Sequence, residues 1–139
     1  LTELFIADRK EHIEEIIKPG LKKNLIIICD RYKYSTICYQ SAQGQDIKKL
    51  VEMHQSMPVP DFVFILDLPV NASAERMRKD KERDKEHKFE KDKEFLEKVR
   101  KNYLNLKNIL PNENIIFIDS SKNINEIFDD IKNHLQSFF

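Results

Sequence analysis

Three uninterrupted apolar runs, each closed by an aspartate, limit the folds open to this sequence more than any other feature. Residues 25–29 are apolar and precede Asp30, while residues 62–67 and 114–119 end in Asp67 and Asp119. Continuous runs rich in β-branched residues are typical of strands that are buried on both faces. Such strands, separated by helices, predict an α/β fold with a parallel sheet and helices on both sides.

The stretches between these runs carry apolar residues at helical spacing. The expected helices cover residues 1–17, 35–55 with an interruption around Gly44, 72–83, 89–110 and 124–135. Pro19 and Gly20 are expected to end the first helix, and Asn71 is expected to cap the third. Without a linker or internal repeat, we predict a single domain over residues 1–139.

The composition excludes several classes of protein. With 24 basic and 24 acidic residues the net charge is +0, which argues against a general binder of nucleic acid or anionic membrane. No apolar run approaches the ~20 residues of a membrane span, and no segment resembles a signal peptide. The two cysteines form no CxxC pair and the four histidines have no metal-ligand spacing, so we expect surface histidines and a reducing, cytoplasmic setting.

Glycine is scarce, since only Gly20 and Gly44 occur. A Walker A loop or a GxGxxG turn needs several glycines close together to bring backbone N–H groups onto phosphate, and this chain has neither. Three parallel strands are also few for such a sheet, and the chain starts without Met inside an apparent helix. We therefore interpret the sequence as a fragment that lacks an N-terminal portion.

The most informative polar residues follow the first apolar run. Ligands of open α/β sheets bind beyond the carboxyl ends of the strands, where Asp30 and Arg31 are expected. The planar fork of Arg31 suits a phosphate, and Asp30 suits Mg²⁺, directly or through water. Ser35 and Tyr39 are four residues apart and would share one helix face. The alternative, a structural ion pair between Arg31 and a carboxylate, stays equally open on these residues alone.

Longer patterns resemble the thymidylate kinases, which are P-loop kinases that transfer the ATP γ-phosphate to dTMP. The resemblance starts with the segment from Leu4 to Arg9 and with Asp30-Arg31-Tyr32, followed by Ser35 and Tyr39-Gln40. It continues in order along the whole chain through Pro60-Asp61, Leu66-Asp67, Ala74-Glu75-Arg76, Phe89-Glu90, Phe95 to Tyr103, and Ile118-Asp119. Each match is weak by itself, but their order and spacing make the resemblance specific.

The resemblance implies a dTMP site. Phe5 would stack on the thymine, Arg9 would bind its carbonyl edge, and Tyr39 would pack under the deoxyribose. Arg31 would bind the phosphate while Asp30 organises Mg²⁺. The remaining implied contacts come from Ser35, Thr36 and Tyr103. Periodicity alone favours plain packing for Phe5, and an aromatic residue on a helix usually packs as well.

A charged run from Glu75 to Lys101 holds twelve basic and nine acidic residues. Runs of mixed sign are usually solvated helix faces. The resemblance implies a lid over about residues 76–93 and ATP contacts at the loop after the last strand. The implied catalytic or ATP-binding residues here are Arg76, Arg78, Arg83 and Ser121, with Lys79, Lys81 and Lys85 as equal alternatives in the lid.

Taken together, the resemblance implies a three-layer αβα sandwich of the P-loop NTPase type, incomplete at its N-terminus, that converts dTMP and ATP to dTDP with Mg²⁺. It also implies a cytoplasmic homodimer without nucleic-acid or membrane partners. The chain by itself is expected to bind dTMP poorly and to be inactive. Two alternatives are another P-loop nucleoside or nucleotide kinase and a non-catalytic module whose charged helix binds a protein or RNA.

Overall fold

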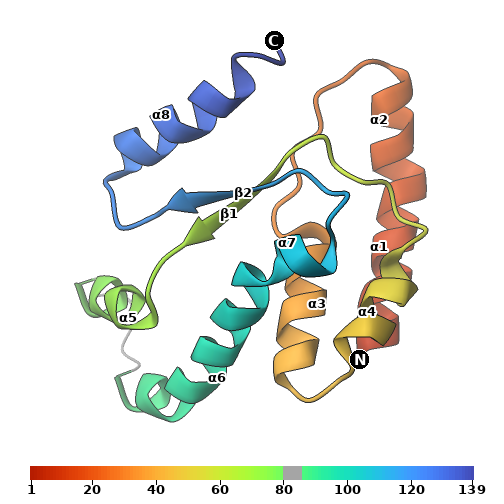
Figure 1. Ribbon diagram of the computed structural model, residues 1–139. Helices are drawn as coiled ribbons and strands as arrows, with labels where there is room; N and C mark the ends of the chain where they lie inside the picture. Colours follow the sequence, from red (N-terminus) through yellow and green to blue (C-terminus); the bar gives the residue numbers. More distant parts are fainter. Residues whose placement is uncertain (80–85) are drawn as a thin grey trace. The chain divides into compact units, whose positions relative to one another are not determined.

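The computed structural model describes residues 1–79 and 86–139, with side chains described outside 86–91, and combines helices with a parallel pair of strands (Figure 1). The chain forms two compact units, Leu1–Val59 and Pro60–Phe139. In the described residues, no helix is both long enough and apolar enough to cross a membrane.

The first unit is helical. Its elements are α1 (Thr2–His12), a π-helical turn η1 (Ile13–Ile17), α2 (Lys18–Lys22), α3 (Tyr32–Ala42) and α4 (Ile47–His54). The first three run on as one continuous helix (Figure 1), so the predicted end at Pro19 is wrong. Pro19 therefore lies inside this continuous helix, directly after the π-helical turn η1, and such an irregular turn accommodates a residue without an N–H.

The predicted strand at residues 25–29 is not formed. Ile26 is 69% exposed and Ile28 is 91% exposed. Among the described residues, the main chain of 26–29 makes no hydrogen bond to another backbone segment. A strand buried on both faces depends on neighbours that pair with its backbone. An apolar run therefore indicates that a segment tends to be buried, but it does not predict whether another strand pairs with its backbone.

The core of the first unit lies where α3 packs against α1 and α4. Ile37 and Cys38 of α3 are fully buried, as is Leu50 of α4. The start of α1 is joined to α3 by the Thr2 hydroxyl, which donates to Gln40 Oε1 at 3.0 Å. This helix packing gives α1 and α3, the two helices with most of the predicted dTMP-binding residues, a common framework.

The second unit is built on two parallel strands, as the apolar runs predict. Strands β1 (Val63–Asp67) and β2 (Ile115–Asp119) pair from Val63 with Ile115 to Asp67 with Asp119. The α/β character and the parallel pairing are thus confirmed. The register places the two strand-ending aspartates beside each other at the carboxyl edge.

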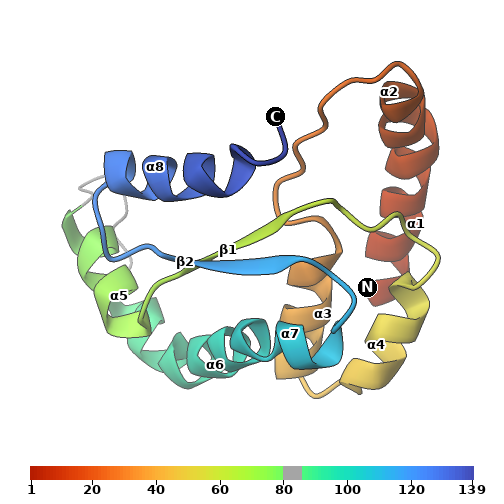
Figure 2. The ribbon, with the colours of Figure 1, turned by 45° about the horizontal axis from the view of Figure 1, so that its top comes forward.

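The helices of this unit in the described residues are α5 (Val70–Lys79), α6 (Glu86–Leu104), α7 (Leu106–Ile109) and α8 (Ile124–Leu135). Figure 2 shows α8 on one side of the strands and α6 with α7 on the other. Helix α8 begins with a capping box in which Asn123 and Glu126 satisfy each other's backbone N–H groups. The predicted cap at Asn71 is wrong, because α5 begins one residue earlier, at Val70.

Leu106 provides a test of the core of the second unit. Its side chain is 0% exposed, whereas Leu104, two residues earlier, is 41% exposed. Leu106→Ala is expected to lower the free energy of unfolding by about 2–5 kcal/mol, since it leaves a cavity. Leu104→Ala, the matched control, should cost well under half as much. Equal urea-unfolding midpoints for the two variants would contradict this packing.

Candidate functional site

The backbone turns sharply where α3 begins. Arg31 has φ 65° and Tyr32 has φ 44°, so two consecutive residues with side chains adopt the left-handed region. Such backbone is unfavourable for residues other than glycine and is concentrated at functional sites. The Arg31 side chain is exposed and, among the residues with described side chains, forms no ion pair with a carboxylate. The structural ion pair considered from the sequence is therefore not formed there.

A cavity of about 440 Å³ lies next to this turn. Its polar lining includes Arg9 of α1 and Asp30, and the complete set of lining residues is Arg9, His12, Ile16, Ile26, Ile27, Ile28, Cys29, Asp30 and Tyr32. The Arg9 guanidinium lies 5.4 Å from the centroid of the Tyr32 ring, a cation–π contact. The cavity thus combines an apolar wall with a cation and a carboxylate.

Two predicted base-binding residues lie on one face of α1. Phe5 and Arg9 are four residues apart, which places them one helical turn from each other. Phe5 is 42% exposed, so its side chain is not part of the core of this unit. The side chain of Arg9 is half-buried and lines the cavity. An exposed aromatic ring one turn from a cavity-lining arginine can stack on a planar ligand and hydrogen-bond its edge.

Three further predicted residues lie on α3. Ser35 and Tyr39 are half-buried and four residues apart on one face. Thr36 is 8% exposed, so little of its side chain is accessible to a ligand. Helix α3 therefore presents Ser35 and Tyr39 more openly than Thr36.

Cys29 and His54 differ from the sequence interpretation. Cys29 does not end a strand but is exposed and lines the cavity, where partial burial raises the pKa of its thiol and the charge of Arg9 opposes that rise. His54 is 1% exposed, so its assignment to the surface is wrong, whereas His12 and His134 are exposed. One sequence signal pointed to burial, since His54 follows the core residue Leu50 by one helical turn, but the polarity of its side chain favoured the surface. His87 lies outside the residues with described side chains.

In the second unit, the carboxyl end of β1 is joined to α6. Asp67 accepts two hydrogen bonds from Arg100, from Nε at 2.8 Å and from Nη2 at 3.0 Å. This bidentate contact raises the pKa of Arg100, chiefly through the hydrogen bond to Asp67. The sequence interpretation missed this pair because its members are 33 residues apart, and no local spacing signals it.

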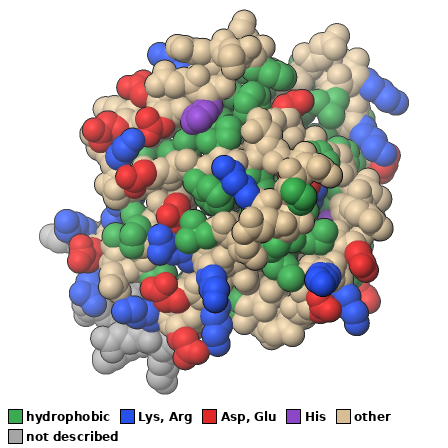
Figure 3. All heavy atoms as spheres, in the orientation of Figure 1, with side chains coloured by type: hydrophobic (Ala, Val, Ile, Leu, Met, Phe, Trp, Pro, Cys, Tyr) green, Lys and Arg blue, Asp and Glu red, His purple; other side chains and the backbone are tan. Residues whose placement is uncertain are grey.

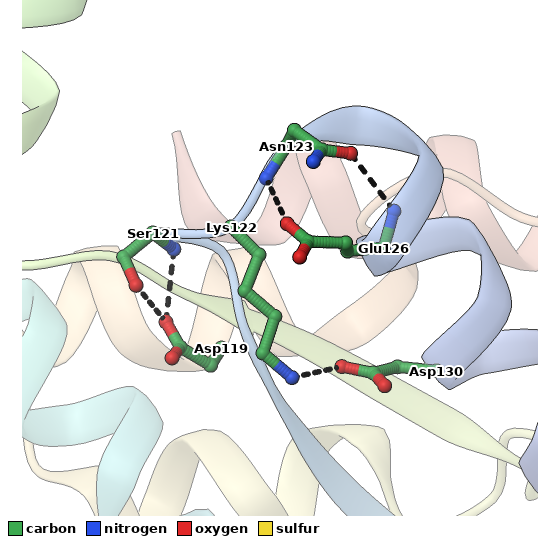
Figure 4. A network of polar contacts seen from close by, with 6 residues as sticks. All are labelled: Asp119, Ser121, Lys122, Asn123, Glu126 and Asp130. Atoms are coloured by element: carbon green, nitrogen blue, oxygen red, sulfur yellow. Dashed lines mark hydrogen bonds and ion pairs between the residues drawn. The ribbon is translucent and has the colours of Figure 1, made fainter.

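The loop after β2 is held by a network of polar contacts (Figure 4). Asp119 accepts from the backbone N–H of Ser121 at 2.9 Å and from its hydroxyl at 2.6 Å. Both bonds lower the pKa of Asp119, and the bond from the Ser121 hydroxyl has the larger effect. Lys122 binds Asp130 of α8 at 2.7 Å. Because the Ser121 hydroxyl donates its hydrogen to Asp119, the hydroxyl oxygen remains available as an acceptor.

Two of the predicted ATP-binding residues come together at this loop. Arg76 of α5 donates from Nη2 to the backbone carbonyl of Lys122 at 3.2 Å, next to Ser121. Arg78 is exposed near the end of α5, and Tyr103 is half-buried on α6. Arg83, part of the predicted lid, lies outside the described residues. On the face drawn in Figure 3, basic and acidic side chains are interspersed, as expected for solvated helix faces of mixed sign.

The described residues were next compared with the ligand groups that hold divalent cations. In the part of the chain that the structure describes, no three His, Cys, Asp or Glu side chains are grouped as a metal site. Mg²⁺, however, commonly keeps several waters and binds one or two carboxylates plus substrate phosphates. Asp30, exposed beside the cavity, fits that kind of site.

Comparison with known proteins identifies one family. The thymidylate kinase family model matches residues 1–131. A "Probable thymidylate kinase" of Thermococcus kodakarensis is 43% identical over 113 residues, which are 81% of this chain and 54% of that protein. Another from Pyrococcus horikoshii is 42% identical over 128 residues, or 92% of this chain and 60% of that protein.

A third relative agrees with these two. The "Thymidylate kinase" of Fervidobacterium nodosum is 37% identical over 132 residues, which cover 92% of this chain and 64% of that protein. The chain thus spans a little over half the length of the curated relatives that it matches.

The Asp67–Arg100 contact should stabilise the second unit. Asp67→Asn is expected to lower the free energy of unfolding by about 1 kcal/mol, because a bidentate, partly buried pair loses its charge. The control is Glu94→Gln, which neutralises the exposed pair of Glu94 with Lys98 and should change stability by about 0.5 kcal/mol or less. A larger loss in the Glu94 variant, measured by thermal unfolding, would contradict this assignment.

Proposed function

Because this chain belongs to the thymidylate kinase family, we propose that the protein that carries it transfers the γ-phosphate of ATP to dTMP and forms dTDP. One observation carries the proposal: a cavity lined by Arg9, Asp30 and Tyr32 lies where the strained turn exposes Arg31. The members of the site come from the two segments that bear the dTMP-site resemblance. Their separation by more than twenty residues makes their meeting in one unit informative.

The acceptor nucleotide is assigned to the cavity of the first unit. Arg9 donates to the carbonyl edge of thymine, and Phe5, one turn earlier and partly exposed, stacks on the ring. Tyr39 and Ser35 contact the deoxyribose and the polar edges of the nucleotide. A cytosine would present an amino group to the arginine donor, which leaves both groups unpaired and disfavours dCMP. Thr36 is only 8% exposed, so its role is packing more than ligand contact.

The acceptor phosphate is assigned to Arg31. Its guanidinium is exposed, without an ion-pair partner among the described side chains, and can bind two phosphate oxygens at once. The positive φ at Arg31 and Tyr32 supports this role, because strained backbone at residues other than glycine is concentrated at functional sites.

ATP is assigned to the second unit. Arg76 and Ser121 meet at the loop after β2, where the hydroxyl oxygen of Ser121 can accept a hydrogen bond from an adenine amino group. By the family resemblance we also assign Arg78 and Arg83 to binding of the ATP phosphates and Tyr103 to binding of dTMP. Arginines that approach the equatorial oxygens of the transferred phosphoryl group stabilise the charge in the transition state.

Asp30 would hold Mg²⁺, directly or through water, and the cation would supply charge screening between the two nucleotides. The attacking phosphate oxygen of dTMP is already anionic, so the residues of this chain need not act as a general base. Their work is to bind, align and neutralise. Alignment of two bound nucleotides by fixed side chains accounts for much of the rate gain in such transfers.

The wider architecture is part of the same proposal. We assign the protein to the P-loop NTPase type, a three-layer αβα sandwich in the cytoplasm. Residues 1–139 contain no glycine-rich phosphate loop, so that loop is assigned to sequence outside this chain. A homodimer is assigned to the α1 surface, where Leu4 is 67% exposed and Ile16 of η1 is 56% exposed.

The choice of acceptor tests the reaction itself. The protein should phosphorylate dTMP with ATP and Mg²⁺, while dUMP reacts more slowly and dCMP and thymidine barely react. Product formation measured with each acceptor at equal concentration decides the assignment. Preference for thymidine would favour a nucleoside kinase, and salt-dependent RNA binding without nucleotide turnover would favour a non-catalytic module.

Arg31→Ala tests the phosphate assignment. The variant is expected to lower kcat/KM for dTMP at least about 100-fold, since two charge-assisted hydrogen bonds are lost. Arg31→Lys should recover part of this loss, because a point charge remains without the planar fork. The control is Lys22→Ala at an exposed position of α2. Near-normal turnover of dTMP by Arg31→Ala would refute the assignment.

A further inference from the structure

His54 is a buried polar residue to which the proposed reaction gives no task. It is the last residue of α4 and is 1% exposed. Its Nδ1 lies 2.6 Å from the backbone carbonyl oxygen of Leu50. A carbonyl oxygen can only accept, so Nδ1 carries the hydrogen and Nε2 of the neutral ring is an acceptor.

Two buried polar atoms of the first unit have complementary needs. Among the described residues, His54 Nε2 and Arg9 Nε are buried without a hydrogen-bond partner. The first is an acceptor and the second is an N–H donor. Because unpaired buried polar groups are costly and uncommon in folded proteins, a donor and an acceptor left over in the same unit point to each other.

A series of contacts connects the two side chains. The Arg9 guanidinium lies over the ring of Tyr32, and the Tyr32 hydroxyl donates to the carbonyl of Pro58 at 3.1 Å. The N–H of Met57, next to Pro58, donates to the carbonyl oxygen of His54 at 3.0 Å. Tyr32 thus touches both Arg9 and the turn that ends α4. Arg9 also exerts the strongest charge effect on the His54 ring.

We propose that His54 is a positioning residue for Arg9: one water molecule accepts a hydrogen bond from Arg9 Nε–H and donates one to His54 Nε2. This inference rests on the proposed function, in which Arg9 reads the thymine edge. A hydrogen bond at Nε fixes the orientation of the planar guanidinium, so that Nη1 and Nη2 are directed toward the cavity. His54 itself does not touch the nucleotide.

The inference makes acceptor binding depend on pH. The charged groups that act on the ring are Arg9 and Lys10 of α1 and Lys33 of α3, all of them cations. Burial, more than these charges, lowers the pKa of His54 below its ordinary value of 6.5. His54 is therefore neutral at pH 7, and acid converts Nε2 from acceptor to donor beside a cation. Affinity for dTMP should therefore fall as the pH drops through the folded-state pKa of His54, which lies below that ordinary value.

The same linkage applies to stability. A histidine whose folded-state pKa is depressed contributes stability that is fully present above the unfolded-state value and is lost as the pH falls through the folded-state value. Unfolding measured between pH 7.5 and 5 should therefore show a loss of stability toward acid, and this loss should be smaller in a variant without His54.

Two amide substitutions separate the two ring nitrogens. In His54→Asn the amide N–H replaces Nδ1 and keeps the bond to Leu50, but nothing replaces Nε2. In His54→Gln the longer side chain can present its oxygen to Arg9. Calorimetric titration with dTMP should give a Kd about 3- to 10-fold higher for His54→Asn, the size of one lost hydrogen bond. His54→Gln should lie closer to wild type, and the Kd for ATP should not change.

The controls distinguish this inference from the proposed function. His134→Asn, an exposed histidine of α8, should leave dTMP binding unchanged. In an Arg9→Lys background, which lacks the Nε–H, His54→Asn should add no further loss. A folded His54→Asn protein with wild-type affinity, or an additive loss in the Arg9→Lys background, would overturn the inference. Failure of the wild-type protein to bind dTMP would instead overturn the proposed function.

The pH arm does not depend on the folding of His54→Asn. The phosphate of dTMP itself titrates near pH 6, so wild type is compared with His54→Gln from pH 7.5 down to the lowest pH at which both proteins stay folded. The fall in affinity toward acid should be at least about 3-fold steeper in wild type. Equal pH profiles for the two proteins would refute the role of His54.

Discussion

The contact between the Arg9 guanidinium and the Tyr32 ring joins the helix that begins the chain to the turn that follows the first apolar run. Tyr32 takes up that position because the backbone at Arg31 and Tyr32 is left-handed, which starts α3 abruptly after Asp30. The same turn leaves the Arg31 side chain exposed. One strained turn therefore provides the wall of the cavity, the support for one arginine and the exposure of another. The cost of two unfavourable residues is offset by the packing of α3 against α1 and α4.

A second constraint governs the other unit. Parallel pairing in the register of Asp67 with Asp119 brings two carboxylates to one edge, where unrelieved repulsion would be unfavourable. Each has its own partner, Arg100 for Asp67 and the N–H and hydroxyl of Ser121 for Asp119. The hydrogen bonds of these partners also hold α6 and the loop after β2 against the ends of the paired strands. The residues assigned to ATP then rest on elements whose placement follows from the sheet.

The elements that the sequence predicts well are those whose partners lie within the chain. Residues 62–67 and 114–119 form strands because they pair with each other, and the stripe from Ile124 to Leu135 forms α8 because it packs on β2. Residues 25–29 have an equally strong apolar pattern but find no pairing partner among the described residues. The shared face of Phe5 and Arg9 follows from helix spacing, whereas the position of Arg31 does not follow from a strand end, because residues 25–29 form no strand. Nor does the bond of Asp67 to Arg100 follow from a local pattern, since it depends on how α6 returns to the sheet.

His54 shows why buried polar residues are harder to interpret from sequence than apolar ones. Its spacing from Leu50 predicts the same buried face, but the polarity of the side chain favours the surface, and the sequence alone does not say which tendency prevails. Burial prevails because the Leu50 carbonyl satisfies one ring nitrogen, and it leaves the other nitrogen as a neutral acceptor near three cations. If the site offered only packing, a leucine side chain would fill it without the free-energy cost of burying a polar ring. The ring therefore has a polar reason to be there, and the unpaired N–H of Arg9 supplies it.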